Sequence, residues 1–199
     1  RFDFDYSGKL SDKTRFFVGG YTTTGQGPRN APANGVQGHQ IKANITQDID
    51  NGFVRLNFKT LDDQSPLFMP APVSIKNGVI SELPGIDPRK ATFYSPYWVA
   101  DATLSKNNTM VNSNVNDGLR VKSDSFGVET ELKLAGGWKL SEKFRSAENT
   151  GRFISIFPAD DVATVAAGTK YATGPKKGQA YTGKAFTATV YNTSMDDMG

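Results

Sequence analysis

Side chains that could do acid–base or metal chemistry are few in this sequence and poorly spaced. Adjacent carboxylates occur at Asp62-Asp63 and at Asp160-Asp161. Neighbouring residues of an extended chain point to opposite sides, so neither doublet is a ready pair of general acid and general base. The second doublet also lacks the alternating acidic spacing of a calcium loop. We interpret both doublets as solvated carboxylates and predict no catalytic residue and no metal ligand.

The histidine and cysteine content narrows the chemistry further. His39 is the single histidine, and the chain has no cysteine. Thiolate metal sites, disulfides and cysteine nucleophiles are therefore excluded. A histidine-dependent triad would have one possible base, and nothing near His39 in the sequence would orient an imidazole. Gly25 and Gly27 lack the rest of a phosphate-binding loop. The sequence predicts no enzyme and no cofactor.

Aromatic side chains are the better candidates for ligand contact. A segment rich in rings occurs within a long stretch that carries many Pro, Asn and Ser residues. Exposed rings are suited to stacking on sugar faces or on planar ligands. The predicted ligand-binding residues are Phe93, Tyr94, Tyr97 and Trp98. The alternative is that these rings pack the loop against its neighbours or form a lipid-facing girdle.

The charge of the chain does not point to a nucleic-acid partner. The net charge is +3 and the isoelectric point about 9.0. Basic residues are nevertheless dispersed among acidic ones, and no basic run is longer than a pair such as Lys176-Lys177. Nucleic-acid binding usually requires a concentrated basic patch or stripe. A solvated surface or lumen explains the balance.

The elements that would position these residues are β-strands. Between Phe53 and Lys59, apolar residues alternate with polar ones, which is typical of a strand with two unlike faces. The Asp50-Asn51-Gly52 segment before it predicts a type I′ hairpin turn, which needs positive φ at both central residues. Gly19-Gly20 indicates a bulge or a close backbone approach. Seven strands are predicted, over residues 2–7, 13–24, 38–49, 53–59, 125–134, 138–145 and 184–193.

The connections between these strands are lopsided. Three are short turns, whereas the others are long segments at 25–37, 64–124 and 151–183. Short strands or a helical turn are expected within the second segment, around Val73 to Ile80. Short turns at one end and long loops at the other are the layout of an outer-membrane β-barrel. Trp138, next to a short turn, fits an interfacial aromatic residue; a core tryptophan of a β-sandwich is the alternative. No stretch has the ~20 apolar residues of a transmembrane helix, but alternating strands would hide a barrel from such a search.

The fold class predicted is therefore all-β: an antiparallel transmembrane β-barrel segment with short periplasmic turns and long extracellular loops. Seven strands are too few to enclose a channel, and residue 1 already lies within the first alternating pattern, so we expect a fragment of a larger barrel. A charge on the lipid face costs roughly 2–4 kcal/mol at the bilayer midplane. Phe58→Arg is thus expected to impair insertion and Asn57→Arg to be tolerated. The lumen-facing residues predicted are Asp3, Asp5, Lys42, Asn44, Arg55, Asn57, Lys59, Glu129, Glu131 and Lys133.

Several runs of residues resemble the early barrel of proteobacterial TonB-dependent receptors. The resemblance covers roughly residues 1–157. It depends on the sequences of strands and turns and includes no catalytic motif. It is carried by His39–Thr46, Asp50–Lys59, Leu61–Asp63, Asn116–Gly118, Ser125–Glu129, Gly137–Arg145 and Gly151–Phe153.

This resemblance implies a 22-stranded barrel in the bacterial outer membrane, with a plug domain inside it. It also implies uptake of scarce nutrients, such as siderophores, cobalamin or oligosaccharides, driven by the TonB complex through the plug. Residues 1–199 would then be part of the barrel, with the plug and the remaining strands absent. The partners expected are outer-membrane lipid, the TonB complex and a small-molecule or oligosaccharide substrate. The alternative left open is a soluble β-sandwich, such as a carbohydrate-binding or adhesive module.

Overall fold

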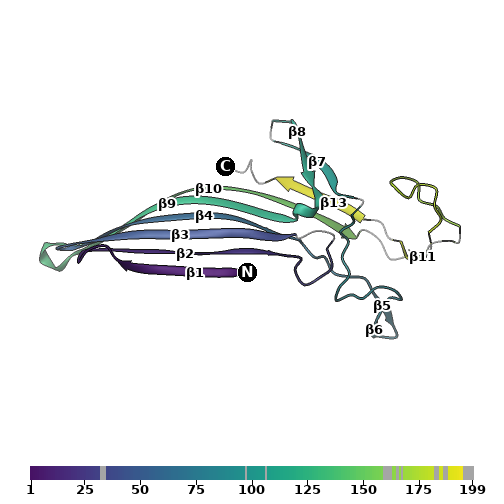
Figure 1. Cartoon of the computed structure of the whole chain (residues 1–199), viewed down its shortest axis with the longest axis horizontal. Helices are drawn as coiled ribbons and strands as arrows, with labels where there is room; N and C mark the ends of the chain where they lie inside the picture. Colours follow the sequence, from purple (N-terminus) through teal and green to yellow (C-terminus); the bar gives the residue numbers. More distant parts are fainter. Residues whose placement is uncertain are drawn as a thin grey trace.

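One seven-stranded antiparallel sheet dominates the computed structural model, as the alternation predicts (Figure 1). The structure describes residues 1–31, 35–96, 98–105, 107–158, 163, 164, 166, 168–181, 184, 185 and 188–194. The sheet is open, with β1 and β13 as its two edges. In spatial order its strands are β1 (Phe2–Lys9), β2 (Thr14–Gly25), β3 (Val36–Ile49), β4 (Gly52–Ser65), β9 (Leu119–Lys133), β10 (Lys139–Pro158) and β13 (Ala188–Ser194).

The two ends of the sheet differ as the sequence predicted. At one end, short turns join β1 to β2, β3 to β4 and β9 to β10. The turn between β9 and β10 contains the 3₁₀ segment η2 (Ala135–Gly137), where Gly136 and Gly137 both have positive φ. At the other end lie the long connections that follow β2, β4 and β10 (Figure 1).

Three small hairpins and a 3₁₀ turn occur within the long connections. The strands expected around Val73 to Ile80 are confirmed as the hairpin of β5 (Val73–Lys76) and β6 (Val79–Glu82). A second hairpin pairs β7 (Ala100–Leu104) with β8 (Met110–Asn114), which leads into η1 (Val115–Asp117). A third pairs β11 (Ala163–Thr164) with β12 (Lys184–Ala185).

Several strands extend further toward the long loops than the sequence predicted. The connection predicted over 64–124 is too long, because β4 runs to Ser65 and β9 begins at Leu119. The loop predicted to begin at residue 151 is also wrong, because β10 continues to Pro158. At the start of β9, Arg120 and Lys122 lie on the face that is apolar nearer the short turns, so the alternation changes phase. At the end of β10, Phe153, Ile154, Ile156 and Phe157 put apolar residues on both faces, so the segment lacks the alternation by which a half-buried strand is recognised.

The last predicted strand is also shorter in the main sheet. Ala188–Ser194 pairs with β10, whereas Lys184–Ala185 belongs to the small hairpin with β11.

The predicted type I′ turn at Asn51-Gly52 is wrong. Ile49 pairs with Gly52, so Asp50 and Asn51 are the central residues, and neither has positive φ. Gly52 has a different role, because a Cβ there would lie 1.8 Å from the carbonyl oxygen of Glu131 on β9. The expected turn geometry occurs instead between β5 and β6, where Asn77 and Gly78 have φ of 51° and 78°.

The two glycines of β2 lie in an unbroken register with β1 and β3, so there is no bulge at this point. Of the two predicted explanations, the close backbone approach is confirmed. A Cβ at Gly20 would lie 1.9 Å from the carbonyl oxygen of Gln40.

The buried core of the described residues lies at the loop end of the sheet. Val115, Ile154 and Ile156 form a small cluster. On the loop side, the Asn192 amide of β13 donates hydrogen bonds to Asp101 Oδ2 at 3.0 Å and to Ser113 Oγ at 2.6 Å. These bonds fix the β7–β8 hairpin on β13. The core therefore anchors loops to strands and leaves the apolar residues of the strands uncovered.

Candidate functional site

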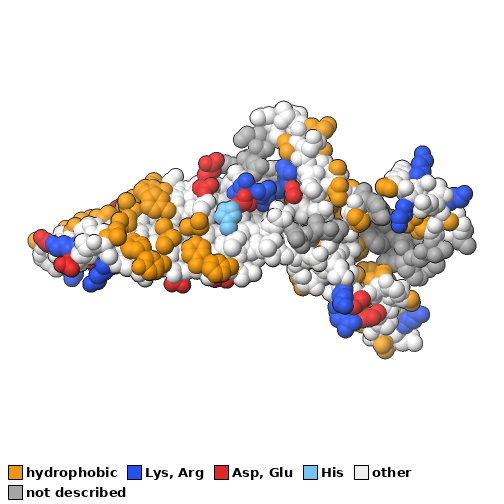
Figure 2. Space-filling model, viewed as in Figure 1, with side chains coloured by type: hydrophobic (Ala, Val, Ile, Leu, Met, Phe, Trp, Pro, Cys, Tyr) orange, Lys and Arg blue, Asp and Glu red, His pale blue; other side chains and the backbone are white. Residues whose placement is uncertain are grey.

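The strand register sorts side chains onto two faces of the sheet, because directly paired residues in an antiparallel sheet share a face. One face, here called the apolar face, carries the aromatic and aliphatic residues of the alternating patterns. Many are exposed, among them Phe2 (65%) and Phe144 (57%). Figure 2 shows hydrophobic side chains gathered over the part of the sheet nearer the short turns. The apolar band comprises Phe2, Phe4, Tyr6, Phe16, Val18, Ile41, Ala43, Ile45, Ile49, Val54, Leu56, Phe58, Phe126, Val128, Leu132, Leu140 and Phe144.

The apolar band does not lie in the same rows on the first and the last strand. In a row of paired residues, Phe2 on β1 is aligned with Asp62 on β4 and Thr150 on β10. The band on β10 reaches only Phe144, which lies six residues closer to the short turns than Thr150.

The limit of the band nearer the short turns also differs between strands. Tyr6 on β1 is aligned with Ser146 on β10, six residues from Leu140. Ile49 on β3 is already in the same row as Leu140, so this difference arises between β1 and β3.

Between the band and the long loops, the same face of the sheet carries charged residues. Arg120 on β9 donates two hydrogen bonds to the Asp62 carboxylate, at 3.0 and 3.1 Å, and Lys122 Nζ lies 3.4 Å from the same group. His39 is directly paired with Asp62, and Figure 2 shows the histidine between the hydrophobic patch and this charged zone.

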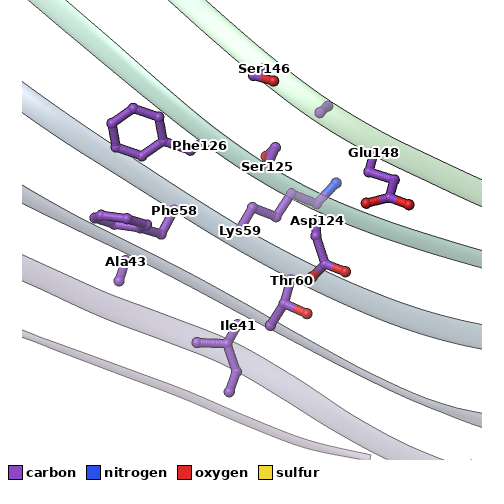
Figure 3. Close-up of a pocket in the computed structure, with 11 residues that line it drawn as sticks. Ile41, Ala43, Phe58, Lys59, Thr60, Asp124, Ser125, Phe126, Ser146 and Glu148 are labelled. Atoms are coloured by element: carbon purple, nitrogen blue, oxygen red, sulfur yellow. The ribbon is translucent and has the colours of Figure 1, made fainter.

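A shallow hollow of about 510 Å³ lies at the boundary between the two zones. Phe58 and Phe126 line one side, with ring centroids 5.3 Å apart. Asp124 and Glu148, which are directly paired, line the other (Figure 3). The hollow therefore marks the line along which the face changes from apolar to ionic.

The opposite face, here called the polar face, contains all ten residues that the sequence predicted to share a lumen-facing side. Its centre is an ion-pair network around Glu129. Arg55 Nη1 lies 3.3 Å from Glu129 Oε2, and Lys143 Nζ lies 3.2 Å from Glu129 Oε1. Arg55 Nε also donates to the buried Thr46 hydroxyl at 2.9 Å. One carboxylate thus joins β4, β9 and β10.

Other ion pairs on the polar face join neighbouring strands. Lys139 Nζ lies 2.7 Å from Glu131 Oε2, and Arg15 pairs with Asp48. Lys143, Lys139 and Arg15 were not among the predicted site residues. The signal that could have found the first was the alternation of Lys143 with Phe144, but its partner is set by strand register and not by sequence spacing.

The predicted aromatic ligand-binding residues have different surroundings. Phe93 and Tyr94 pack against the buried cluster of Val115, Ile154 and Ile156. The backbone N–H of Leu67 donates to the Tyr94 hydroxyl at 3.0 Å, and burial raises the pKa of this phenol. These two rings therefore already have the packing role that was the alternative reading, and their contact with a ligand stays a prediction.

The remaining aromatic candidates are placed less centrally. Trp98 forms an isolated β-bridge with Ser95 and is 40% exposed. Tyr97 lies outside the described residues. Trp138, at the short-turn end, is 75% exposed. The sandwich alternative would require it to be a core residue, and within the described structure it is not.

The described residues hold no group of three or more His, Asp or Glu side chains that could bind a metal ion. Searching the same residues for a helix that is long and apolar enough to cross a membrane finds none. Comparison with family models, curated proteins and solved structures finds no match to this chain.

Proposed function

We propose that this chain forms part of the wall and mouth of an outer-membrane β-barrel that takes up nutrients, of the TonB-dependent receptor type. The observation that carries the proposal is the exposed apolar band. Its bare aromatic and aliphatic side chains would contact lipid, the polar face would line the lumen, and the long connections would lie outside the cell. The larger barrel, the energy-coupling partner and the class of nutrient remain part of the proposal.

The alternative of a soluble β-sandwich has less support. Burying the apolar band of a sandwich would need a second sheet packed about 10 Å away. In the part of the chain that the structure describes, the other sheets are two-stranded hairpins, and they belong to the long connections. Phe58, near the centre of the main sheet, is 48% exposed.

Paired arginine substitutions on β4 test the proposal. Leu56 lies at the middle of the β4 part of the band and Phe58 at its edge, whereas Asn57 lies on the polar face. An arginine at Leu56 should reduce assembly into outer membranes by an amount equivalent to about 2–4 kcal/mol, because the charge meets hydrocarbon at the midplane. Phe58→Arg should have a smaller effect, because the cost falls toward the interfaces.

The matched control is Asn57→Arg, which adds the same charge between these two positions but on the opposite face. The measurement is the fraction of each variant that folds in bilayers and resists extraction. Equal assembly of all three variants, or a water-soluble monomer that needs no detergent, would contradict the proposed membrane orientation.

A further inference from the structure

The polar face carries a hollow of about 540 Å³ whose lining is unusually basic. It lies over the middle of β3, β4, β9 and β10, and its floor includes Gly127, which presents no side chain. Three cationic side chains contribute to the lining without an ion-pair partner among the described residues. They are Lys42, Lys59 and Arg145.

The neighbouring cations of the same face behave differently. Arg55 and Lys143 share Glu129, Lys139 pairs with Glu131, and Arg15 pairs with Asp48. Glu129, the acidic residue that lines the hollow, is therefore already engaged. Asp5 lies in the same row as Lys42, but Gly19 separates the two, and Asp5 makes no ion pair with Lys42 in the described structure.

Two of the unpaired cations oppose each other. Lys42 and Lys59 are directly paired across β3 and β4, which brings the Cβ atoms of such pairs to about 4.5–5.5 Å. Like charges directly opposite destabilise a sheet. This local cost would be reversed if an anion lay between the two ammonium groups.

The next row along the sheet adds complementary donors. Asn57, Gly127 and Arg145 are aligned across β4, β9 and β10. The planar guanidinium of arginine binds carboxylate and phosphate groups through two parallel hydrogen bonds. The volume of the hollow lies within the range of small-molecule sites, about 300–1,000 Å³.

We infer that this hollow binds a small polyanion that bears phosphate or carboxylate groups, and that Lys42, Lys59 and Arg145 are the residues that bind it. The charged zone above the apolar band is a weaker candidate for such a role, since Asp62 neutralises much of Arg120 and Lys122, and Asp124 and Glu148 lie beside them. The inference rests on the proposed function, because it assigns a ligand class to the face that would line the lumen.

Titration with inorganic pyrophosphate at low ionic strength tests the inference. Isothermal calorimetry should detect saturable binding to the folded chain. Lys42→Gln, Lys59→Gln and Arg145→Gln should each weaken the affinity about tenfold, because each removes a charge-assisted hydrogen bond. Lys76→Gln, on the exposed β5–β6 hairpin, removes the same charge elsewhere and should leave the affinity unchanged.

Thermal unfolding without ligand separates loss of binding from loss of folding. Lys42→Gln and Lys59→Gln should keep or raise the melting temperature, because they remove a like-charge pair. Absence of binding by the wild-type chain, or equal weakening by Lys76→Gln, would overturn the inference. The readout does not depend on membrane insertion, so failure of the β4 arginine test would leave this result interpretable, and the reverse also holds.

Discussion

At the scale of single residues, glycines mark the points where the backbones of two segments approach most closely. Gly118, between η1 and β9, has a φ of 62°, and a Cβ there would lie 2.3 Å from the carbonyl oxygen of Ser65. Gly78, in the β5–β6 turn, also has positive φ, but a Cβ there would meet open space. Gly118 also has a ψ of −126°, outside the left-handed helical region, so its backbone conformation and the close approach both disfavour a side chain, whereas Gly78 is restricted by positive φ alone.

We predict that Gly118→Ala destabilises the folded chain more than Gly78→Ala. Positive φ alone costs a non-glycine residue about 1–2 kcal/mol, and only at Gly118 must the backbone of β4 also shift. Denaturant unfolding of both variants measures the difference. Equal free energies of unfolding would mean that the junction between the long loop and the sheet relaxes without cost.

At the scale of elements, alternation predicts the strands well where one face stays apolar, and fails where the pattern changes along a strand. Residues 125–134 alternate, whereas Arg120, Lys122 and Asp124 bring charges to the apolar side of β9, so the sequence does not predict that this strand begins at Leu119. The end of β10 differs again, because it carries apolar residues on both faces. Strand pairing there is imposed by neighbours already in register, which is a property of the sheet and not of the local sequence.

The polar face could be predicted from the sequence, but its ion pairs could not. The alternation places Arg55 and Glu129 on similar faces of two strands. Their contact, however, depends on the register between residues 74 apart in the chain. For the same reason, the sequence cannot show that Lys42, Lys59 and Arg145 have no ion-pair partner among the described residues.

The predicted loop that proved to be strand can be checked by hydrogen exchange. In β9, residues 119–124 are flanked by β4 on one side and β10 on the other, so each amide has a ladder partner available. We expect these amides to exchange as slowly as those of residues 126–132, and far more slowly than those of residues 83–91 in the irregular part of the long connection. Rapid exchange over 119–124 would indicate that β9 begins where the alternation does.

At the scale of the whole molecule, the described chain buries little of its apolar surface. Its buried cluster is small and lies at the loop end, so burial within the described chain accounts for few of its large apolar side chains. β1 and β13 each present an unpaired edge within the described structure. Exposed edges of this length favour pairing with further strands, which is the arrangement that a closed barrel would supply.

The orientation of the strands relative to the membrane offers the final prediction. If lipid covers the apolar band, the strands must cross the bilayer, and strands of transmembrane barrels are tilted by ≈ 35–45°. Polarised infrared spectroscopy of the protein in oriented bilayers measures this angle from the dichroism of the amide I band. The Leu56→Arg variant, expected to insert poorly, should lose the dichroism and so serves as the control. Strands that lie in the bilayer plane, or an unordered signal from the wild-type chain, would contradict a transmembrane wall, whereas a tilt near 40° would link the sequence of each strand to its depth in the membrane.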